Sequence, residues 1–325
     1  MLKAGRVPEV SVLMPVHGNA PFLKEAIESV ENQTLVNFEF LIVLDRVGKK
    51  AESLLKKRAN INNKIKLITS NSPGISSALN VGLNHCKSPY VARLDSDDLM
   101  HPQRLEVQKS FLDGHGTIDC VGSQTIKIDA GGVDIGISCL PEKPVEISNV
   151  LPFRNCLAHP SVMFRKDTVT SIGGYRSEFD GCEDYDLWLR MDKGNNFKNL
   201  DMALTSYRIW PKQNINMLPD DLIGKLKRTR ESKLENLYMP HQRKSKIWLD
   251  PILIAKNMVF LQACTSLDLM FLSMKPPRSL LKTFTSSFRF FYGCSFIPIK
   301  AVRLFGVFAK YGMKYIIIRR LISWK

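Results

Sequence analysis

The sequence predicts an α/β fold in which a mostly parallel sheet is flanked by helices, with a helical, basic region following it. Near the N-terminus, short apolar runs alternate with segments of helical periodicity, and this rhythm is typical of parallel sheets. The strand-like runs are Val10–Val16, Phe38–Leu44, Ile65–Ile68 and Tyr90–Leu94. The helical segments between them are Pro21–Asn32, Lys49–Ala59 and Ile75–His85. Ligands of such sheets bind at the carboxyl ends of the strands, so the polar residues after each run are candidate site residues.

The pattern changes after the last of these runs. We expect a helix near Pro102–Leu112, then a strand-rich stretch in which Gly131-Gly132 marks a hairpin turn, then mixed structure to about Trp210. The organisation is therefore α/β first and α+β later. A composition shift between Leu218 and His241 predicts a boundary, and we assign residues 1–215 to one domain and residues 216–325 to a second, helical and basic region.

Positive charge is concentrated in the second region. The chain has 46 Lys and Arg against 31 Asp and Glu, a net charge of +15, and most of the excess lies after His241. Such a segment attracts polyanions, either nucleic acid or an anionic membrane surface. A final helix carries a basic cluster opposite apolar residues, and the cluster consists of Lys300, Arg303, Lys310 and Lys314. This arrangement favours a membrane interface over nucleic acid, and packing of the apolar stripe on the protein core is the alternative.

Three further features of the sequence bear on the cellular location of the protein and on whether it spans a membrane. Ile252–Met274 is mostly apolar but interrupted by Lys256 and Asp268, which predicts a buried or interfacial hairpin rather than a span. The seven cysteines include no Cys-x-x-Cys pair, so we expect neither a disulfide framework nor a thiolate zinc site. No apolar stretch follows Lys3 and Arg6, so no signal peptide is expected. Together these features predict a cytoplasmic protein that is peripheral on the inner face of the cell membrane.

The clearest chemical signal is Asp95-Ser96-Asp97-Asp98, which directly follows the run Tyr90–Leu94. Carboxylates crowded at a strand end repel one another, and a divalent cation with oxygen ligands is the usual compensation. A hard cation held there can bridge the phosphates of a nucleotide and neutralise charge on a departing diphosphate. An Asx turn or a helix cap ahead of Pro102 is the alternative explanation.

Several further motifs occur in a fixed order along the chain. They are Val10–Asn19, Ser29–Thr34, Phe38–Asp45, Gly74–Gly82, Ala92–Asp98, His159–Met163, Gly173–Tyr175 and Cys182–Asp186. In this order they closely resemble the family 2 glycosyltransferases, and the resemblance extends from Val10 to about Trp210. It implies a GT-A fold with a Rossmann-like sheet, and inverting, metal-dependent transfer of a sugar from a nucleotide donor. The setting it implies is assembly of bacterial surface polysaccharides such as O-antigen and capsule.

The resemblance also implies roles for residues on the donor side. Pro15, Val16 and His17 are implied to line the nucleotide pocket, and Asp45 to accept a hydrogen bond from the base. Asp97 is implied to ligate Mn²⁺ or Mg²⁺, and Asp95 to contact the ribose or the sugar. The other donor-side candidates are Asn19, Asn80, Arg93 and Ser96. For Arg93, compensation of the acidic cluster and a structural salt bridge are both open.

On the acceptor side, Glu183-Asp184 resembles an acidic pair whose second carboxylate acts as general base, and we assign both residues to catalysis. A negative first turn of the helix reaching Arg190 also explains Asp184, and both explanations can hold. Trp210 departs from the family, because many relatives have a metal-binding histidine at this place after Tyr-Arg-x. Either the metal has fewer protein ligands here or another group, such as His159, replaces the histidine.

The expected reaction is transfer of one hexose or N-acetylhexosamine from a nucleotide sugar, with UDP as the expected nucleotide, to a lipid-linked saccharide. The basic region adds an anionic membrane surface as a partner, and we expect no nucleic acid. No Gln-x-x-Arg-Trp motif of processive synthases is present, so one sugar is expected per encounter. The rival hypotheses are transfer to a polyprenyl phosphate, nucleotidyl transfer, and an inactive homologue acting as a membrane-binding protein.

Overall fold

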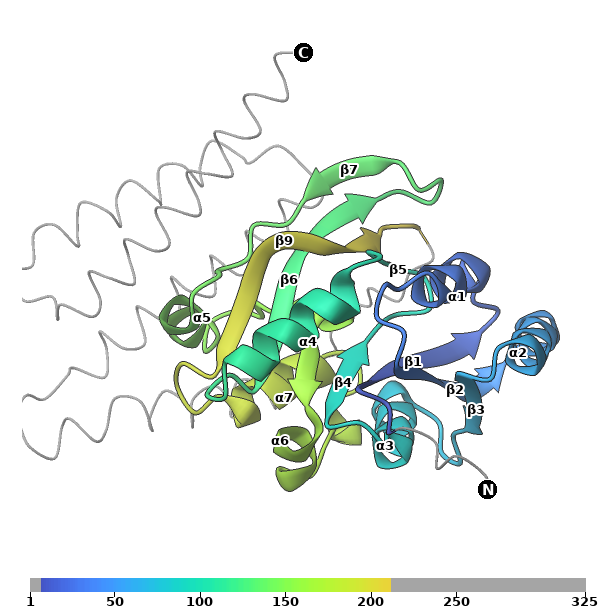
Figure 1. Cartoon of the computed structure of the whole chain (residues 1–325), viewed down its shortest axis with the longest axis horizontal. Coiled ribbons are helices and arrows are strands. Elements are labelled where there is room, and N and C mark those ends of the chain that lie inside the picture. The colour runs from blue at the N-terminus through green and yellow to red at the C-terminus, as the bar shows by residue number, and fades with distance from the viewer. Residues whose placement is uncertain (1–6, 212–325) are drawn as a thin grey trace, which may run out of the picture. The chain divides into compact units, whose positions relative to one another are not determined.

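The structure, a computed structural model, describes residues 7–211 (Figure 1). Apart from residues 152–154, these residues belong to one compact unit. The predictions for residues 216–325, including the interrupted apolar segment 252–274 and the basic final helix, lie outside the described residues. Among the helices within residues 7–211, none has the length and apolar character that a membrane span requires.

The first half of the described chain has the predicted parallel sheet. Its strands run in the order β3-β2-β1-β4, and all three pairings are parallel. The strands are β1 (Val10–Gly18), β2 (Phe38–Val47), β3 (Ile65–Thr69) and β4 (Tyr90–Arg93). The helices that connect them are α1 (Leu23–Glu31), α2 (Lys49–Ile61) and α3 (Ile75–His85). Each predicted strand and helix in this half is therefore confirmed.

Burial explains why these residues form these elements. Residues 10–14 of β1 and 38–43 of β2 are buried at every position, as expected for strands that are covered on both faces. The buried residues of α1 recur at helical spacing: Leu23, Ala26, Ile27 and Val30. On α3, Gly82 permits close packing on the sheet, since a Cβ atom there would lie 2.2 Å from Leu13 Cδ1 and 2.8 Å from Val43 Cγ2.

The second half continues the sheet in the order β4-β8-β6-β9-β5, with β7 paired to β6, and here the pairing is mixed. Its strands are β5 (Leu99–Met100), β6 (Cys120–Ile128), β7 (Asp134–Ile137), β8 (Met163–Arg165) and β9 (Phe197–Arg208). Its helical segments are α4 (Arg104–Gly114), α5 (Pro144–Val150), η1 (His159–Ser161), α6 (Lys166–Ser171), η2 (Ser177–Phe179) and α7 (Glu183–Met191). The expected hairpin turn joins β6 to β7, and Gly132 N donates to Asp129 O at 3.0 Å.

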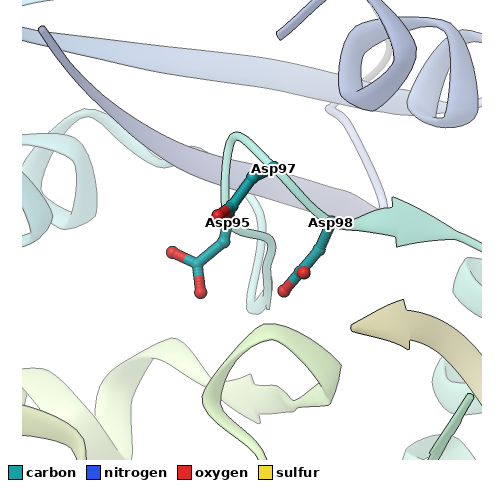
Figure 2. Close-up of side chains that lie close together, drawn as sticks. All are labelled: Asp95, Asp97 and Asp98. Atoms are coloured by element: carbon teal, nitrogen blue, oxygen red, sulfur yellow. The ribbon is translucent and has the colours of Figure 1, made fainter. Parts of the chain in front are cut away.

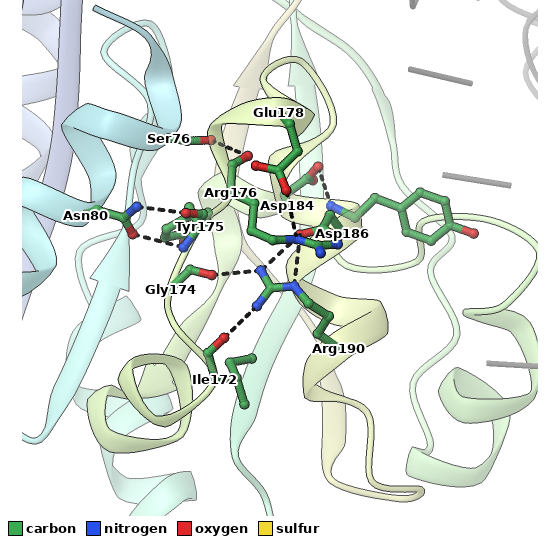
Figure 3. A network of polar contacts seen from close by, with 11 residues as sticks. Ser76, Asn80, Ile172, Gly174, Tyr175, Arg176, Glu178, Asp184, Asp186 and Arg190 are labelled. Carbon is green, nitrogen blue, oxygen red and sulfur yellow. Dashed lines mark hydrogen bonds and ion pairs between the residues drawn. The ribbon is translucent and has the colours of Figure 1, made fainter. Parts of the chain in front are cut away.

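Helix α7 is held in place by a buried carboxylate. Asp186 is fully buried and pairs with Arg176 and with Arg190, whose Nε lies 2.9 Å from Asp186 Oδ2 (Figure 3). Arg190 also donates to the carbonyl oxygens of Ile172 and Gly174, at 3.0 Å and 2.7 Å. These contacts fasten the loop before α7 to the helix, so the position of the helix N-terminus is fixed.

The same loop is tied to α3 in the first half of the sheet. Asn80 Nδ2 donates to the Tyr175 carbonyl at 2.7 Å, and Asn80 Oδ1 accepts from the Tyr175 amide at 2.9 Å. Asp180 Oδ1 accepts from the Ser76 amide at 3.0 Å, and so serves as a long-range cap for the first turn of α3. These hydrogen bonds hold the carboxyl edge of the parallel sheet next to the N-terminus of α7.

Replacing Asp186 with asparagine should lower the free energy of unfolding by about 3 kcal/mol, because the change leaves two arginines beside a neutral buried side chain. Urea denaturation followed by circular dichroism measures the loss. Glu178→Gln is the matched control, since Glu178 also faces Arg176, at 3.9 Å, but is half exposed. The control should cost less than about 1 kcal/mol. Equal losses in the two variants would contradict the assignment of Asp186 as the fixing carboxylate.

Candidate active site at the sheet edge

The first group of site residues lies where β1 and β2 end. His17 and Asp45 are register partners, and His17 Nδ1 lies 3.3 Å from Asp45 Oδ2 and 3.0 Å from the Asp45 carbonyl oxygen. Asp45 is buried, and it accepts hydrogen bonds from Arg46 Nε at 3.0 Å and from the Gly74 amide at 3.2 Å. Burial alone would raise the pKa of Asp45, but these hydrogen bonds outweigh burial and leave the pKa below its usual value. Asp45 is therefore a carboxylate at neutral pH, and both of its oxygens can accept hydrogen bonds.

The other predicted residues of β1 line the same edge to different degrees. Pro15 is half-buried and Val16 is buried, whereas His17 and Asn19 are exposed. Asn80 is half-buried on α3, and both hydrogen-bonding atoms of its amide are engaged with the Tyr175 backbone. Asn80 thus joins two elements of the site, and its predicted contact with a nucleotide stays a prediction.

The acidic turn after β4 gathers Asp95, Asp97 and Asp98, and Figure 2 shows their carboxyl groups on the turn before β5. One carboxylate oxygen from each aspartate lies within 4.8 Å of the others. Asp97 Oδ2 accepts from Trp210 Nε1 at 2.9 Å, and Asp98 Oδ1 accepts from the Arg208 amide at 2.8 Å. Ser96 is half-buried in the same turn.

Two carboxyl groups of this turn have a pKa above the usual value. Burial, and then the charge of Asp95, raise the pKa of Asp97 and of Asp98 above the usual value. Asp98 Oδ2 is buried and has no hydrogen-bond partner among residues 7–211. Carboxylate oxygens that lie close together fit a hard divalent cation, so Mn²⁺ or Mg²⁺ suits the donors present. The same residues are the ones for which the sequence predicts a metal site.

The acidic pair lies at the N-terminus of α7. Asp184 is half-buried, with Oδ1 accepting from the Tyr185 amide and Oδ2 from Asn155 Nδ2, both at 2.7 Å. Burial raises the pKa of Asp184, and the hydrogen bond from Asn155 limits the rise. Glu183 is buried beside it, and burial together with the charge of Asp184 raises the pKa of Glu183 to about 7. Of the two residues, Asp184 is the less buried.

Arg93 connects the two acidic groups. Its side chain is 1% exposed and forms an ion pair with Asp95. Its positive charge also lowers the pKa of both Glu183 and Asp184, against the larger effect of burial. The sequence left two roles open for Arg93: a structural salt bridge and compensation of the acidic cluster. The ion pair with Asp95 is both at once, because it places a positive charge beside one of the clustered aspartates. Since the guanidinium is buried, its effect on a bound donor would be exerted through Asp95.

His159 does not join the aspartate cluster. Its Nε2 lies 3.0 Å from Tyr175 Oη, and its Nδ1 lies 3.8 Å from Glu183 Oε1. Burial, and then the charge of Arg93, hold its pKa well below the usual value, so the imidazole is neutral. Within residues 7–211, the group of potential metal ligands contains the three aspartates and no histidine or cysteine.

Comparison with known proteins identifies the family. A model of glycosyl transferase family 2 matches residues 11–154. The O-antigen biosynthesis glycosyltransferase WbnJ of Escherichia coli is 35% identical over 211 residues, which are 62% of this chain and 80% of the relative. The chain belongs to glycosyl transferase family 2. A second relative of this glycosyltransferase, the E. coli UDP-Gal:alpha-D-GlcNAc-diphosphoundecaprenol beta-1,3-galactosyltransferase, is 30% identical over 208 residues, 62% of this chain and 74% of the relative.

A solved structure supports the predicted fold of this glycosyltransferase. S. aureus TarS 1–349, in complex with UDP-GlcNAc, matches with a TM-score of 0.57 at 18% identity. The match covers 70% of this chain and 67% of TarS 1–349. At this identity the likeness establishes the fold, which is the predicted GT-A fold.

Some residues of the glycosyltransferase site were missed by reasoning from sequence. Asn155, which bonds the acidic pair, is a single amide in a loop, and no spacing marks it. Arg208, which bonds the acidic turn, stands in the Tyr207–Trp210 segment that the sequence already marked, so its place in that segment was the available signal. Arg104 is buried below the same turn and donates to the Arg93 carbonyl at 2.8 Å, but on the sequence it is an ordinary helical arginine.

The raised pKa of Glu183 predicts a pH-dependent stability. The folded-state pKa of about 7 exceeds the unfolded value, so this stabilising contribution is present in acid and is lost as the pH rises through 7. Between about pH 5 and pH 8.5, Glu183→Gln should gain about 2 kcal/mol of unfolding free energy relative to wild type. Urea denaturation of both proteins at the two pH values measures this difference. Parallel pH profiles would show that Glu183 is ionised throughout.

Proposed function

We propose that this glycosyltransferase performs a single, inverting, divalent-cation-dependent transfer of one hexose or N-acetylhexosamine from a UDP-sugar to a lipid-linked saccharide in surface polysaccharide biosynthesis. The observation that carries the proposal is the cluster of Asp95, Asp97 and Asp98, in which one carboxylate oxygen from each residue lies within 4.8 Å of the others. The names of the E. coli relatives, which concern O-antigen biosynthesis and a diphosphoundecaprenol acceptor, support the substrate classes.

On the donor side, Asp45 would accept the hydrogen bond of the nucleotide base at the end of β2. Asp97 would ligate the cation, and Asp95, held by Arg93, would face the ribose or the sugar. The cation, when bound, would neutralise charge on the diphosphate as it leaves. Because Asp95 and Asp97 belong to one short turn after β4, the donor sugar and the diphosphate would be held by adjacent residues.

On the acceptor side, Asp184 would act as the general base. Inversion requires a carboxylate that removes the proton of the acceptor hydroxyl as its oxygen attacks the anomeric carbon opposite the diphosphate. Asp184 is half-buried and its carboxylate is oriented by Asn155, whereas Glu183 is buried against His159. The raised pKa of Asp184 makes it a stronger base than an ordinary aspartate.

The proposal is tested by incubating the full chain with a panel of nucleotide sugars, a lipid-linked saccharide and Mn²⁺. We expect release of UDP from one donor, loss of release with a chelator, and a product whose anomeric configuration is inverted by nuclear magnetic resonance. Release of pyrophosphate would indicate nucleotidyl transfer instead. A monosaccharide phospholipid product would indicate a polyprenyl phosphate acceptor.

The control for this experiment is Asp184→Asn, which keeps the shape of the side chain but cannot accept the proton. Turnover should fall about 100-fold or more while UDP binding, measured by calorimetry, is retained. Near-normal turnover of the variant would remove Asp184 from the role of base. No UDP release from any donor by the wild-type chain would favour an inactive, membrane-binding homologue.

We also propose that residues 216–325 dock on the anionic inner face of the cell membrane, where a lipid-linked acceptor is found. The full chain should co-sediment with vesicles containing phosphatidylglycerol and much less with phosphatidylcholine vesicles. Replacing Lys300, Arg303, Lys310 and Lys314 with glutamate should abolish that preference. Equal sedimentation of the variant and the wild type would contradict the docking proposal. Steeply salt-dependent binding to arbitrary DNA would instead indicate a nucleic-acid partner.

A further inference from the structure

Trp210 contacts the acidic turn directly. Its indole Nε1 donates to Asp97 Oδ2 at 2.9 Å, and its ring packs edge-on against Phe22, with ring centroids 5.4 Å apart and an interplanar angle of 78°. The Phe22 ring in turn lies under the guanidinium of Arg208, 4.2 Å from its centroid. The indole is therefore held from two sides, and its N–H has a fixed direction.

Arg208, the last residue of β9, donates two further hydrogen bonds to the acidic turn. The Arg208 amide donates to Asp98 Oδ1 at 2.8 Å, and Arg208 Nε donates to the Asp97 carbonyl at 2.9 Å. Arg208 is fully buried, and its Nη2 reaches Glu25 Oε2 at 2.7 Å. Together with the bond from Trp210, these make three hydrogen bonds from residues 208 and 210 to the turn. They restrain both the backbone and the side chains of the turn.

The bond from Trp210 has a chemical consequence for Asp97. An indole N–H is a donor only and offers no lone pair, so Trp210 cannot itself bind a cation. The bond occupies Asp97 Oδ2 and restrains rotation of the carboxylate. The nearby histidines are used elsewhere, since His159 contacts Tyr175 and Glu183, and His101 Nδ1 accepts from the Gln103 amide.

We propose that Trp210 is a positioning residue that fixes Asp97 through Oδ2, so that Asp97 presents Oδ1 to a cation at a site whose protein ligands are all carboxylate oxygens. This inference rests on the proposed cation-dependent function. Because the protein then contributes few ligands, the cation is held well only when the diphosphate of the donor completes its coordination. Mn²⁺ and UDP should therefore bind to the chain together far more tightly than Mn²⁺ alone.

The test is a titration of the full chain with Mn²⁺, with free ion followed by electron paramagnetic resonance, in the presence and absence of UDP. Trp210→Phe keeps an aromatic ring against Phe22 but removes the N–H. In the presence of UDP, this variant should bind Mn²⁺ about three- to tenfold more weakly, because the Asp97 carboxylate must be ordered on binding. Affinity for UDP without the metal should be unchanged. Unchanged or tighter Mn²⁺ binding by Trp210→Phe would overturn the proposal.

Two reference variants make the result specific. Trp188→Phe is a matched tryptophan replacement, because Trp188 is buried against Phe197 and makes no hydrogen bond to the acidic turn. It should bind Mn²⁺ like the wild type. Asp97→Asn should lose Mn²⁺ binding. If Trp188→Phe weakened Mn²⁺ binding as much as Trp210→Phe does, the effect would be general loosening of the fold and the proposal would fall.

Spectroscopy of the bound Mn²⁺ identifies which atoms of the protein coordinate it. Electron spin echo spectra of Mn²⁺ on the wild-type chain should show no coupling to protein nitrogen, and Trp210→His should introduce such a coupling. Nitrogen coupling in the wild type would overturn the all-oxygen site. A wild-type chain that binds UDP but no Mn²⁺ would refute the cation-dependent function and this inference together. A wild-type chain that binds Mn²⁺ with UDP, and a Trp210→Phe variant that binds it equally well, would refute the inference alone.

Discussion

Three arginine side chains lie fully buried around the Asp95–Asp98 turn. The arrangement of the site depends on the ion pairs and hydrogen bonds that stabilise these three buried charges. Arg93 pairs with Asp95, Arg208 binds the Asp97 carbonyl and Glu25, and Arg104 lies beneath the turn. All the hydrogen-bond acceptors of Arg104 are neutral. They are the carbonyl oxygens of residues 93, 160 and 162 and the side chains of residues 108 and 205. Buried charge is costly unless it is paired or fully hydrogen-bonded, so these contacts specify the arrangement of the elements that supply them.

The site is assembled from both halves of the sheet. The parallel half contributes the ends of β1, β2 and β4, and the mixed half contributes α7 and the end of β9. The loop from Gly174 to Asp180 joins them, because it is bonded to α3 on one side and to α7 on the other. Neither half alone carries both acidic groups. The placement of the two acidic groups relative to each other is therefore a property of tertiary packing rather than of either half.

Sequence reasoning reached the parallel half because its strands are continuous apolar runs and its helices have a single buried face. It also placed Asp45, Asp95 and Asp97 at the carboxyl ends of strands, where the structure has them; their roles stay a prediction from the family resemblance. The pairing of β6 with β9 was out of reach, because strands far apart in the chain find each other through burial, and their register shifts twice. The partners of the acidic residues were likewise unpredictable. Asn155 and Arg208 each contact an acidic group through hydrogen bonds of one residue, and no sequence periodicity predicts such contacts.

Gly74 illustrates how narrowly this arrangement limits the sequence. Its φ of +108° suits glycine, its amide binds Asp45, and a Cβ there would lie 2.3 Å from Asp180 Oδ2. Any side chain at this position would push Asp180 away from the first turn of α3 and also strain the backbone that donates to Asp45. A substitution at residue 74 would therefore disturb the end of β2 and the start of α3 at once. A single hydrogen atom in place of a side chain at residue 74 therefore preserves both the cap on α3 and the hydrogen bond to Asp45.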